Sequence, residues 1–408
     1  MFSITADRLF EDLEALARFG ASEGGGITRR AYAPAYQDAS RWLCDRMDAA
    51  GLKARVDAVG NVIGRLGPDD GPAVLSGSHI DTVPNGGRYD GAYGVLAALE
   101  CARTLKEQGA ALDHALEVVA FVDEEGAYLN LLGSRAMTGA LRADELSRAR
   151  SEDGVTLLEA MRAAGLDPPR APEAGRPPAD FHCYVELHIE QGPVLERASV
   201  PIGIVEGIVG ILEVDYTFRG EAGHAGTTPM DLRHDALRSA ADFITRTYVK
   251  LPPRLDASAR VTFGSLTVEP NASNVIPEEV RLRQELRDLS PERLNALFEE
   301  SREIAAAVAR EQTVHLSVSK ASFDAPARMS ERVAGRIEEA CDRLGLTSRR
   351  MSSGAGHDAQ VLAGVCDTGM IFVPSHKGQS HRADEWTDPK DLERGANLLL
   401  HALTALAD

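Results

Sequence analysis

The sequence has few cysteines and no motif that would group them. Its five cysteines lie far apart, and none belongs to a Cys-x-x-Cys pair. Disulfide frameworks and structural zinc sites both depend on closely spaced or regularly paired cysteines, so the spacing argues against both. We therefore expect the cysteines to be small residues of the hydrophobic core.

Long apolar runs and a phosphate-binding loop are also missing. No stretch approaches the roughly eighteen consecutive apolar residues that cross a bilayer. The first twenty residues form a charged amphipathic pattern without a signal-peptide core, so we expect a cytoplasmic protein. The sequence has no Gly-x-x-x-x-Gly-Lys-Ser/Thr loop, which argues against a nucleoside triphosphatase. Its Gly-x-Ser-x-Gly match, GASEG (20–24), follows a helical pattern and not a strand, so it is no nucleophile elbow and we do not expect a serine hydrolase.

Positive charge is in the minority. The chain has 44 lysines and arginines against 62 acidic residues, which gives a formal net charge of −18. Such a surface repels phosphate backbones and anionic lipids, so we expect neither nucleic acid nor a membrane as a partner. The 408 residues, 44% of them hydrophobic, exceed the usual size of one compact unit and predict two domains.

Apolar strand patterns alternate with helical patterns in the first half of the chain. PAVLSGSH (72–79) predicts a buried strand, residues 95–105 have helical spacing, and LEVVAFVDEEG (116–126) predicts a second strand that ends in acids. YVELHIEQG (184–192) predicts a further strand. The order strand, helix, strand is typical of an α/β fold with a largely parallel sheet.

The pattern changes at about residue 209. ILEVDYTFRG (211–220) and RVTFGSLTVEP (260–270) alternate with period two, and helical runs cover 235–249 and 291–310. Four strands and two helices predict an antiparallel α+β insertion, after which helix and strand patterns resume. We therefore expect a discontinuous catalytic domain formed by residues 1–208 and 325–408, with an inserted domain at 209–324.

Polar residues stand where the predicted strands end, which is where ligands bind in open α/β sheets. His79 ends one strand, and Asp81 is two residues further on, so on an extended chain the carboxylate would hold the far nitrogen of the imidazole. Asp90 follows a glycine-rich turn before a helix, where a carboxylate is favoured and could bridge two cations. Glu124 and Glu125 stand side by side. Metal-assisted hydrolysis needs one carboxylate as a cation ligand and another as the general base for the attacking water, and the pair fits that division.

Two further strand ends supply histidines. His188 lies on one strand face with Glu186 and Glu190, and His376 and His381 follow another strand. Singly, such residues are usually hydrogen-bonded structural histidines, helix caps or surface acids. Their joint occurrence at strand ends favours a site for two divalent cations of zinc, manganese, cobalt or nickel, with ligands His79, Asp90, Glu125, His188 and His381. His376 we expect on the loop surface.

Seven segments carry a family resemblance. They are GSHIDTVPNGGRYDGAYGVLAALE, DEEG followed by LLGSRAMTG, HIEQGPVLE, GHAGTTPM, PNASNVIP, SGAGHDA, and GMIFVPS followed by SH. In this order they resemble the hydantoinase/carbamoylase branch of the M20 metallopeptidase superfamily, over about residues 20–400. The branch contains N-carbamoyl-L-amino-acid hydrolases, allantoate amidohydrolases and β-ureidopropionase-like enzymes.

The resemblance implies roles for particular residues. It implies the same five cation ligands with Asp90 bridging, Glu124 as general base and Asp81 behind His79. It also implies an M20-type catalytic domain with an inserted lid that forms a homodimer, and a small substrate that carries a carboxylate. The residues implied to hold substrate are Gln191, His224, Asn274, Arg287 and Gly356, with His224 also acting on the reacting carbonyl.

The chain departs from the branch at two places. Tyr128, Leu129 and Asn130 stand where Arg-Phe is typical after the acidic pair, and Arg382 follows His381 where a small residue is typical. The expected reaction is cleavage of an N-carbamoyl group from an L-amino acid or related small acid. Because these departures alter the wall of the pocket, two alternative substrates stay open, allantoate and N-acyl amino acids. A non-catalytic binding or scaffold protein is disfavoured, because the set of cation ligands is complete.

Overall fold

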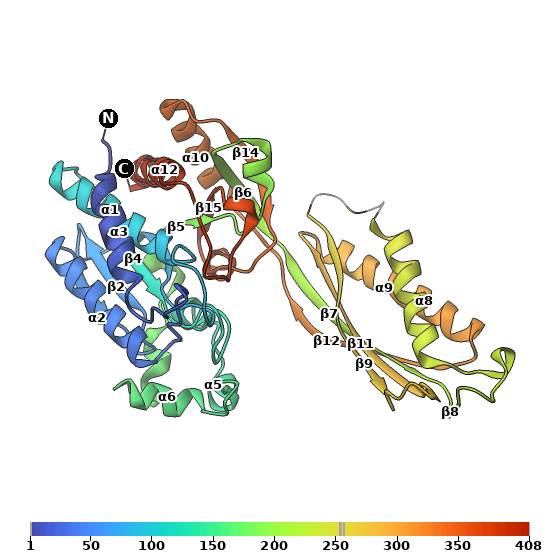
Figure 1. Ribbon diagram of the computed structural model, residues 1–408. Helices are drawn as coiled ribbons and strands as arrows, with labels where there is room; N and C mark the ends of the chain where they lie inside the picture. Colours follow the sequence, from blue (N-terminus) through green and yellow to red (C-terminus); the bar gives the residue numbers. More distant parts are fainter. Residues whose placement is uncertain (1, 253–254, 256–257, 408) are drawn as a thin grey trace. The chain divides into compact units, whose positions relative to one another are not determined.

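The computed structural model describes residues 2–252, 255 and 258–407. The chain forms two compact units. Unit 1 contains residues 1–206, 328–351 and 355–408, and unit 2 contains residues 207–327 and 352–354. Both ends of the chain therefore contribute to unit 1 (Figure 1). No helix of the described residues is long and apolar enough to cross a membrane.

Unit 1 is built on one mixed sheet, which has nine strands in the described residues. The strand order is β1-β2-β4-β3-β5-β15-β6-β13, and β14 pairs with β6. The strands are β1 (Lys53–Val56), β2 (Val62–Leu66), β3 (Ala73–His79), β4 (Ala115–Phe121), β5 (Phe181–Ile189), β6 (Ile202–Ile208), β13 (Ala327–Arg328), β14 (Ser348–Ser353) and β15 (Asp367–Val373).

The four central strands, β4, β3, β5 and β15, are parallel, and β1, β2 and β6 pair antiparallel at the flanks. Every residue of β3 and β4 is buried, which is typical of parallel strands covered on both faces. The α/β class with a largely parallel central sheet, predicted from the sequence, is confirmed.

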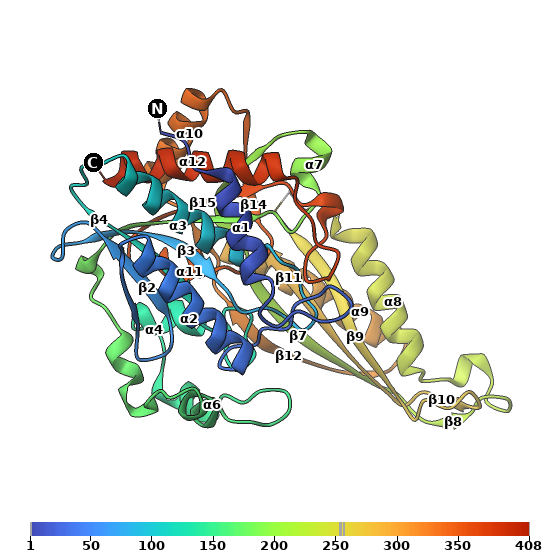
Figure 2. The same cartoon turned by 60° about the vertical axis from the view of Figure 1, so that its left-hand side comes forward.

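Helices cover both faces of this sheet (Figure 2). On one face α3 (Ala92–Glu107) packs against β3 and β5, with α1 (Ala6–Leu16) and α12 (Pro389–Ala407) beside it. On the other face lie α4 (Leu132–Met137) and α11 (Asp358–Leu362). The remaining helices of unit 1 are α2 (Pro34–Ala49), α5 (Ala143–Arg148), α6 (Leu157–Ala163), α7 (Val194–Ala198) and α10 (Glu331–Leu344).

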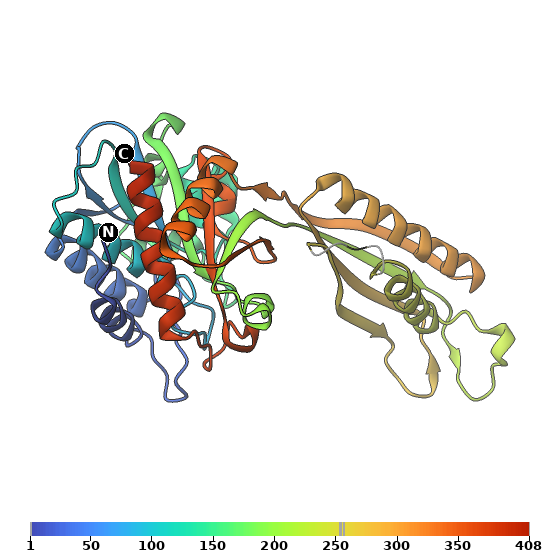
Figure 3. The ribbon, with the colours of Figure 1, turned by 90° about the horizontal axis from the view of Figure 1, so that it is seen from above.

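Unit 2 is a four-stranded antiparallel sheet with two helices on one face (Figure 3). The strand order is β12 (His315–Asp324), β7 (Gly210–Arg219), β11 (Glu279–Asp288), β9 (Arg260–Glu269). Residues of β7 and β11 alternate between buried and more exposed, and the buried ones pack on α8 (Ala236–Lys250) and α9 (Pro291–Glu311). A two-stranded arm, β8 (Gly223–His224) with β10 (Val275–Ile276), continues from the end of the sheet where β7 ends and β11 begins (Figure 2).

A buried arginine fixes the chain just beyond the end of β3. Arg29 is 1% exposed, and its guanidinium donates to the carbonyl oxygens of Leu16, Phe19 and Ile80 at 2.9, 2.9 and 2.5 Å. The backbones of Arg29 and Thr82 are also joined, because the Thr82 amide donates to the Arg29 carbonyl at 3.1 Å. Burial lowers the pKa of Arg29 to about 10. The guanidinium therefore holds the segment that follows His79 against the N-terminal segment.

Replacing Arg29 with methionine is expected to lower the free energy of unfolding of unit 1 by at least about 3 kcal/mol. The substitution removes three hydrogen bonds in a buried place, and each buried carbonyl left without its donor costs about 1 kcal/mol or more. Urea unfolding followed by tryptophan fluorescence would measure the loss, because both tryptophans, Trp42 and Trp386, lie in unit 1. The control is Arg18→Met at an exposed position, where we expect a change within about 0.5 kcal/mol. An equal effect of the two substitutions would contradict the role given to Arg29.

Candidate metal centre

The candidate site lies where the four parallel strands of unit 1 end. Because β3, β4, β5 and β15 run in one direction, their carboxyl ends meet at one edge of the sheet. His79 is the last residue of β3 and His188 is in β5, while Glu124 and Glu125 follow β4. Asp90 stands just before α3, and His381 lies in the loop between β15 and α12.

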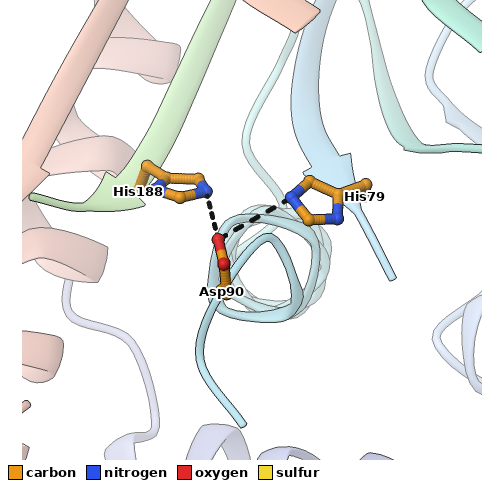
Figure 4. Close-up of side chains that lie close together, drawn as sticks. All are labelled: His79, Asp90 and His188. Carbon is orange, nitrogen blue, oxygen red and sulfur yellow. Dashed lines mark ion pairs between the residues drawn. The ribbon is translucent and has the colours of Figure 1, made fainter. Parts of the chain in front are cut away.

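Three of these side chains form a first group, His79, Asp90 and His188 (Figure 4). The Nε2 atom of His188 lies 3.2 Å from Asp90 Oδ1, and Nε2 of His79 lies 3.9 Å from the same oxygen. The three residues are 2%, 5% and 1% exposed. Their donor atoms lie within 4.8 Å of one another, so one ion could contact all three.

Asp90 also belongs to a second group, with Glu125 and His381. Nε2 of His381 lies 3.3 Å from Asp90 Oδ2 and 3.6 Å from Glu125 Oε2. Asp90 therefore turns one oxygen to each group, as a bridging ligand does. The His381 side chain is 50% exposed, so the second group is more open to solvent than the first. Glu124 lies beside the first group, with Oε2 3.6 Å from His79 Nε2, and it has a donor atom within 4.8 Å of one of Glu125.

The backbone around the first group aims both imidazoles at Asp90. Gly91 has a φ of 61°, and a Cβ atom there would lie 2.4 Å from His79 Nε2, so a side chain at this position would collide with the imidazole. The Gly91 amide donates to His188 Nε2 at 3.2 Å, and Nδ1 of His188 lies 2.8 Å from the Ile189 carbonyl. Position 91 therefore requires glycine.

The contact expected between Asp81 and His79 takes a different form. His79 Nδ1 lies 3.0 Å from the backbone carbonyl of Asp81, whereas the Asp81 carboxylate is 3.8 Å away. That carboxylate instead accepts the amides of Glu124 and Glu125, at 3.4 and 3.1 Å. The reason is that β3 ends at His79, so the alternation of an extended strand does not reach Asp81. Asp81 thus positions the acidic pair.

Electrostatics at the site favour a bound cation. Burial raises the pKa of Glu124 well above its usual range, and burial together with Asp90 raises that of Glu125 to about 8. Burial lowers the pKa of His79 to about 4, whereas for His188 the nearby Asp90 carboxylate outweighs burial and raises the pKa to about 9. Crowded buried acids repel one another unless a cation lies between them.

The donor set itself fits divalent cations. Among the described residues, the buried Oε1 atoms of Glu125 and Gln191 have no hydrogen-bond partner. The Nε2 atoms of the three histidines point at carboxylate oxygens, and the groups contain no thiolate. Imidazole and carboxylate together suit zinc, manganese, cobalt and nickel.

Comparison with known proteins decides the family. Residues 75–405 match the family model described as peptidase family M20/M25/M40. The chain belongs to the M20 peptidase family. This confirms the family that the sequence motifs indicated. Enzymes of the M20 family typically bind divalent metals, and the two groups around Asp90 are the candidate ligands of this member.

Relatives that match over nearly the whole length of both chains have more specific names. An N-carbamoyl-L-amino acid amidohydrolase of Geobacillus stearothermophilus is 42% identical over 409 residues, which is 99% of each chain. An allantoate amidohydrolase of Bacillus subtilis is 37% identical, over 97% of this chain and 96% of the relative. The crystal structure of a hydantoinase/carbamoylase family amidase from Burkholderia multivorans superposes with a TM-score of 0.92 at 33% identity, covering 100% of this chain and 98% of that one.

The residues predicted to hold substrate in this M20 member fall into separate places. Gln191 lies in unit 1, with Nε2 3.1 Å from both carboxylate oxygens of Asp90, and Gly356 precedes His357 in the loop before α11. His224 and Asn274 lie together on the arm of unit 2, where the Ala225 amide donates to the Asn274 carbonyl at 3.0 Å. The structure therefore places His224 and Asn274 close together.

Arg287 lies far from that arm within unit 2. It stands near the end of β11, where its guanidinium pairs with both oxygens of Glu285 at 2.7 and 3.0 Å. The arm leaves the sheet at the other end, beside Arg219 and Glu279. Eight residue steps of about 3.3 Å separate Glu279 from Arg287, so the arm is roughly 25 Å or more from Arg287. Within one unit 2 these residues do not reach the same small molecule.

Sequence reasoning missed two residues close to the groups. Glu385 accepts the amides of Tyr89 and Asp90, and the ring of His357 lies 4.6 Å from that of His188. His357 stands in the SGAGHDA motif and Glu385 follows the SH of another motif by four residues, but nothing in the spacing singles either of them out. His376, expected on the loop surface, is half exposed and lies 2.9 Å from Glu196.

Tyr128 and Leu129, which depart from the family pattern, lie in the turn after β4. The amides of Tyr128 and Leu129 donate to the buried Asp123 carboxylate at 3.1 and 2.8 Å. The Tyr128 ring packs edge-on against Tyr32 with centroids 5.9 Å apart. These residues therefore shape the turn that directly follows Glu124 and Glu125.

Proposed function

We propose that this M20 family member is a metal-dependent amidohydrolase that removes the N-carbamoyl group from an L-amino acid or a related small acid. The observation that carries the proposal is a pair of donor groups that share Asp90 and adjoin Glu124. The chain is also 42% and 40% identical over nearly its whole length to two relatives named as N-carbamoyl-L-amino acid amidohydrolases.

Two divalent cations would be held by the two groups, with Asp90 between them. His79, Asp90 and His188 would hold one, and Asp90, Glu125 and His381 the other. When bound, such cations polarise a carbonyl group and lower the pKa of a bound water. The absence of thiolate donors fits zinc, manganese, cobalt or nickel.

The protein's own residues would then move protons and hold the substrate. Glu124 takes a proton from the attacking water and returns it to the departing amino nitrogen. The products are the amino acid and carbamate, and carbamate decomposes to carbon dioxide and ammonia. His224 and Asn274 would donate hydrogen bonds to the oxygen that becomes negative, and Arg287 would bind the substrate carboxylate in place of Glu285.

Removing the cations is expected to abolish hydrolysis of an N-carbamoyl amino acid. Dialysis against a strong chelator should give an inactive protein with a lower melting temperature, because the cations bind only the folded state. Adding back manganese, cobalt, nickel or zinc should restore both activity and melting temperature. Activity that persists in a preparation shown by elemental analysis to be metal-free would refute the proposal.

Allantoate is the second candidate substrate. It is favoured by the relatives named as allantoate amidohydrolases and by the departure at Tyr128 and Leu129, in the turn after the acidic pair. Values of kcat/KM for an N-carbamoyl amino acid, an N-acyl amino acid and allantoate would decide between them. We expect the highest value for the carbamoyl compound.

The separation of the arm from Arg287 supports a homodimer. One unit 2 cannot bring His224 and Arg287 to one small substrate, whereas two copies could supply one each. Homo-oligomers of this kind are usually closed dimers with two-fold symmetry. Light scattering should then give twice the mass of one chain, and a monomer would count against this part of the proposal.

A further inference from the structure

Glu385 is a buried carboxylate that joins two loops of the candidate site. Its side chain belongs to the loop between β15 and α12, and the residue is 4% exposed. Oε1 accepts the amides of Tyr89 and Asp90, at 2.9 and 3.2 Å, and Oε2 accepts the Ser380 hydroxyl at 2.8 Å. One carboxylate thus spans the backbone of the Asp90 loop and a side chain of its own loop.

The surroundings of Glu385 are shaped to admit it. A Cβ atom on Gly87 would lie 2.1 Å from Oε1, so the Asp90 loop leaves room for the carboxylate at this point. Trp386, the next residue, packs edge-on against Tyr89 with ring centroids 5.9 Å apart. Its carbonyl accepts the His376 amide at 2.8 Å, which ties the beginning of the loop to its end.

The second donor group depends on this loop more than the first does. His79 and His188 belong to central strands of the sheet. His381 belongs to no strand, is half exposed and has a φ of 58°, in the left-handed region. Its neighbour Ser380 donates to Glu385 and also lies 3.3 Å from Asp90 Oδ2. The position of His381 relative to Asp90 therefore follows from the contact between Ser380 and Glu385.

We infer that Glu385 is a positioning residue that creates the second cation position by fixing the His381 loop to the Asp90 loop. The inference rests on the proposed two-cation function. It assigns unequal dependence to the two positions: both histidines of the first belong to strands, whereas the histidine of the second lies in the loop that Glu385 fixes. Loss of Glu385 should therefore release one cation and leave the other.

The experiment compares Glu385→Ala and Glu385→Gln with the unchanged protein. Titration of the metal-free proteins with zinc, in competition with a chromophoric chelator, gives the number and affinity of bound ions. We expect two ions in the unchanged protein. In Glu385→Ala one ion should bind as before and the other about 10–100-fold more weakly, the usual effect of losing a residue that orients ligands. Glu385→Gln, which keeps one acceptor oxygen, should weaken the same ion less.

A matched control, Glu196 of α7, contacts the same loop. Glu196 accepts the Lys377 amide at 2.8 Å and is a surface carboxylate, but among the described contacts it does not touch Asp90 or His381. Glu196→Gln should bind two ions with unchanged affinity. The melting temperatures of the metal-free variants report any general loss of folding, and if Glu385→Ala does not fold, Glu385→Gln decides.

The outcomes separate this inference from the proposed function. If the unchanged protein binds no zinc or a single ion, the two-cation proposal fails. If it binds two ions and the Glu385 variants bind both as tightly, or lose both equally, the assignment of Glu385 to the second position is overturned. A selective loss that is recovered at high metal concentration, with the KM for substrate unchanged, supports it.

Discussion

Replacing Glu124 with glutamine is expected to lower kcat for an N-carbamoyl amino acid by about 10²–10⁴-fold. Glutamine has nearly the same shape as glutamate but cannot accept a proton, so the attacking water would lose its base. Glu124 is 8% exposed, and its carboxylate lies beside the first donor group. Steady-state kinetics at saturating metal would measure the loss, and metal content should stay that of the unchanged protein.

The comparison needs a control for the substitution itself. Glu196→Gln makes the same chemical change on the surface and should leave kcat within a factor of two or so of the unchanged protein. Unchanged turnover of the Glu124 variant would rule out this residue as the base. If no substrate of the panel is turned over by the unchanged protein, a non-catalytic binding role becomes the better interpretation.

Mixing two nearly inactive variants is expected to restore about one quarter of the original activity. The variants are Glu124→Gln and His224→Ala. If each site takes its catalytic unit from one chain and its arm from the other, half of the randomly reassorted dimers are mixed. Each mixed dimer has one site with an intact Glu124 and an intact His224. Activity measured after subunit exchange would test this.

The control for mixing uses two defects in the same unit. Glu124→Gln mixed with Glu125→Ala should stay inactive, because every site then has a damaged catalytic unit whichever arm it meets. A mixture of the first pair that remains inactive, although mass spectrometry of tagged chains proves exchange, would show that the arm does not serve the other chain. Restoration in the control would equally contradict the arrangement.

The parts of the site that the sequence predicts are those set by strand periodicity. PAVLSGSH and LEVVAFV are rich in apolar and small residues, which correctly indicates β3 and β4 as covered strands, and the residues at their ends meet at one edge of the sheet. The prediction for Asp81 extended the same periodicity two residues beyond the end of β3. Its carboxylate binds the amides of Glu124 and Glu125, and no local pattern indicates so distant a partner.

Long-range contacts account for the rest. Glu385 and Tyr89 are 296 positions apart, and their contact exists only because β15 returns the chain beside β5. The sequence positions of His224 and Arg287 likewise carry no information on the distance between the two side chains. Only the register of β11 against β7 shows that Arg287 stands near one end of the four-stranded sheet and that the arm with His224 leaves from the other end.

The strand order of unit 1 has a consequence for how the protein is made. β15 lies between β5 and β6, and the His381 loop and α12 follow it in the sequence. During synthesis from the amino end, the central sheet stays incomplete until residue 373 has left the ribosome, by which time the whole of 207–327 has emerged. Unit 2 can therefore fold first. The segment with β15 is synthesised later and must insert between β5 and β6 to complete the central sheet. Truncations that remove β15 and the residues after it should yield aggregation-prone protein rather than a smaller enzyme.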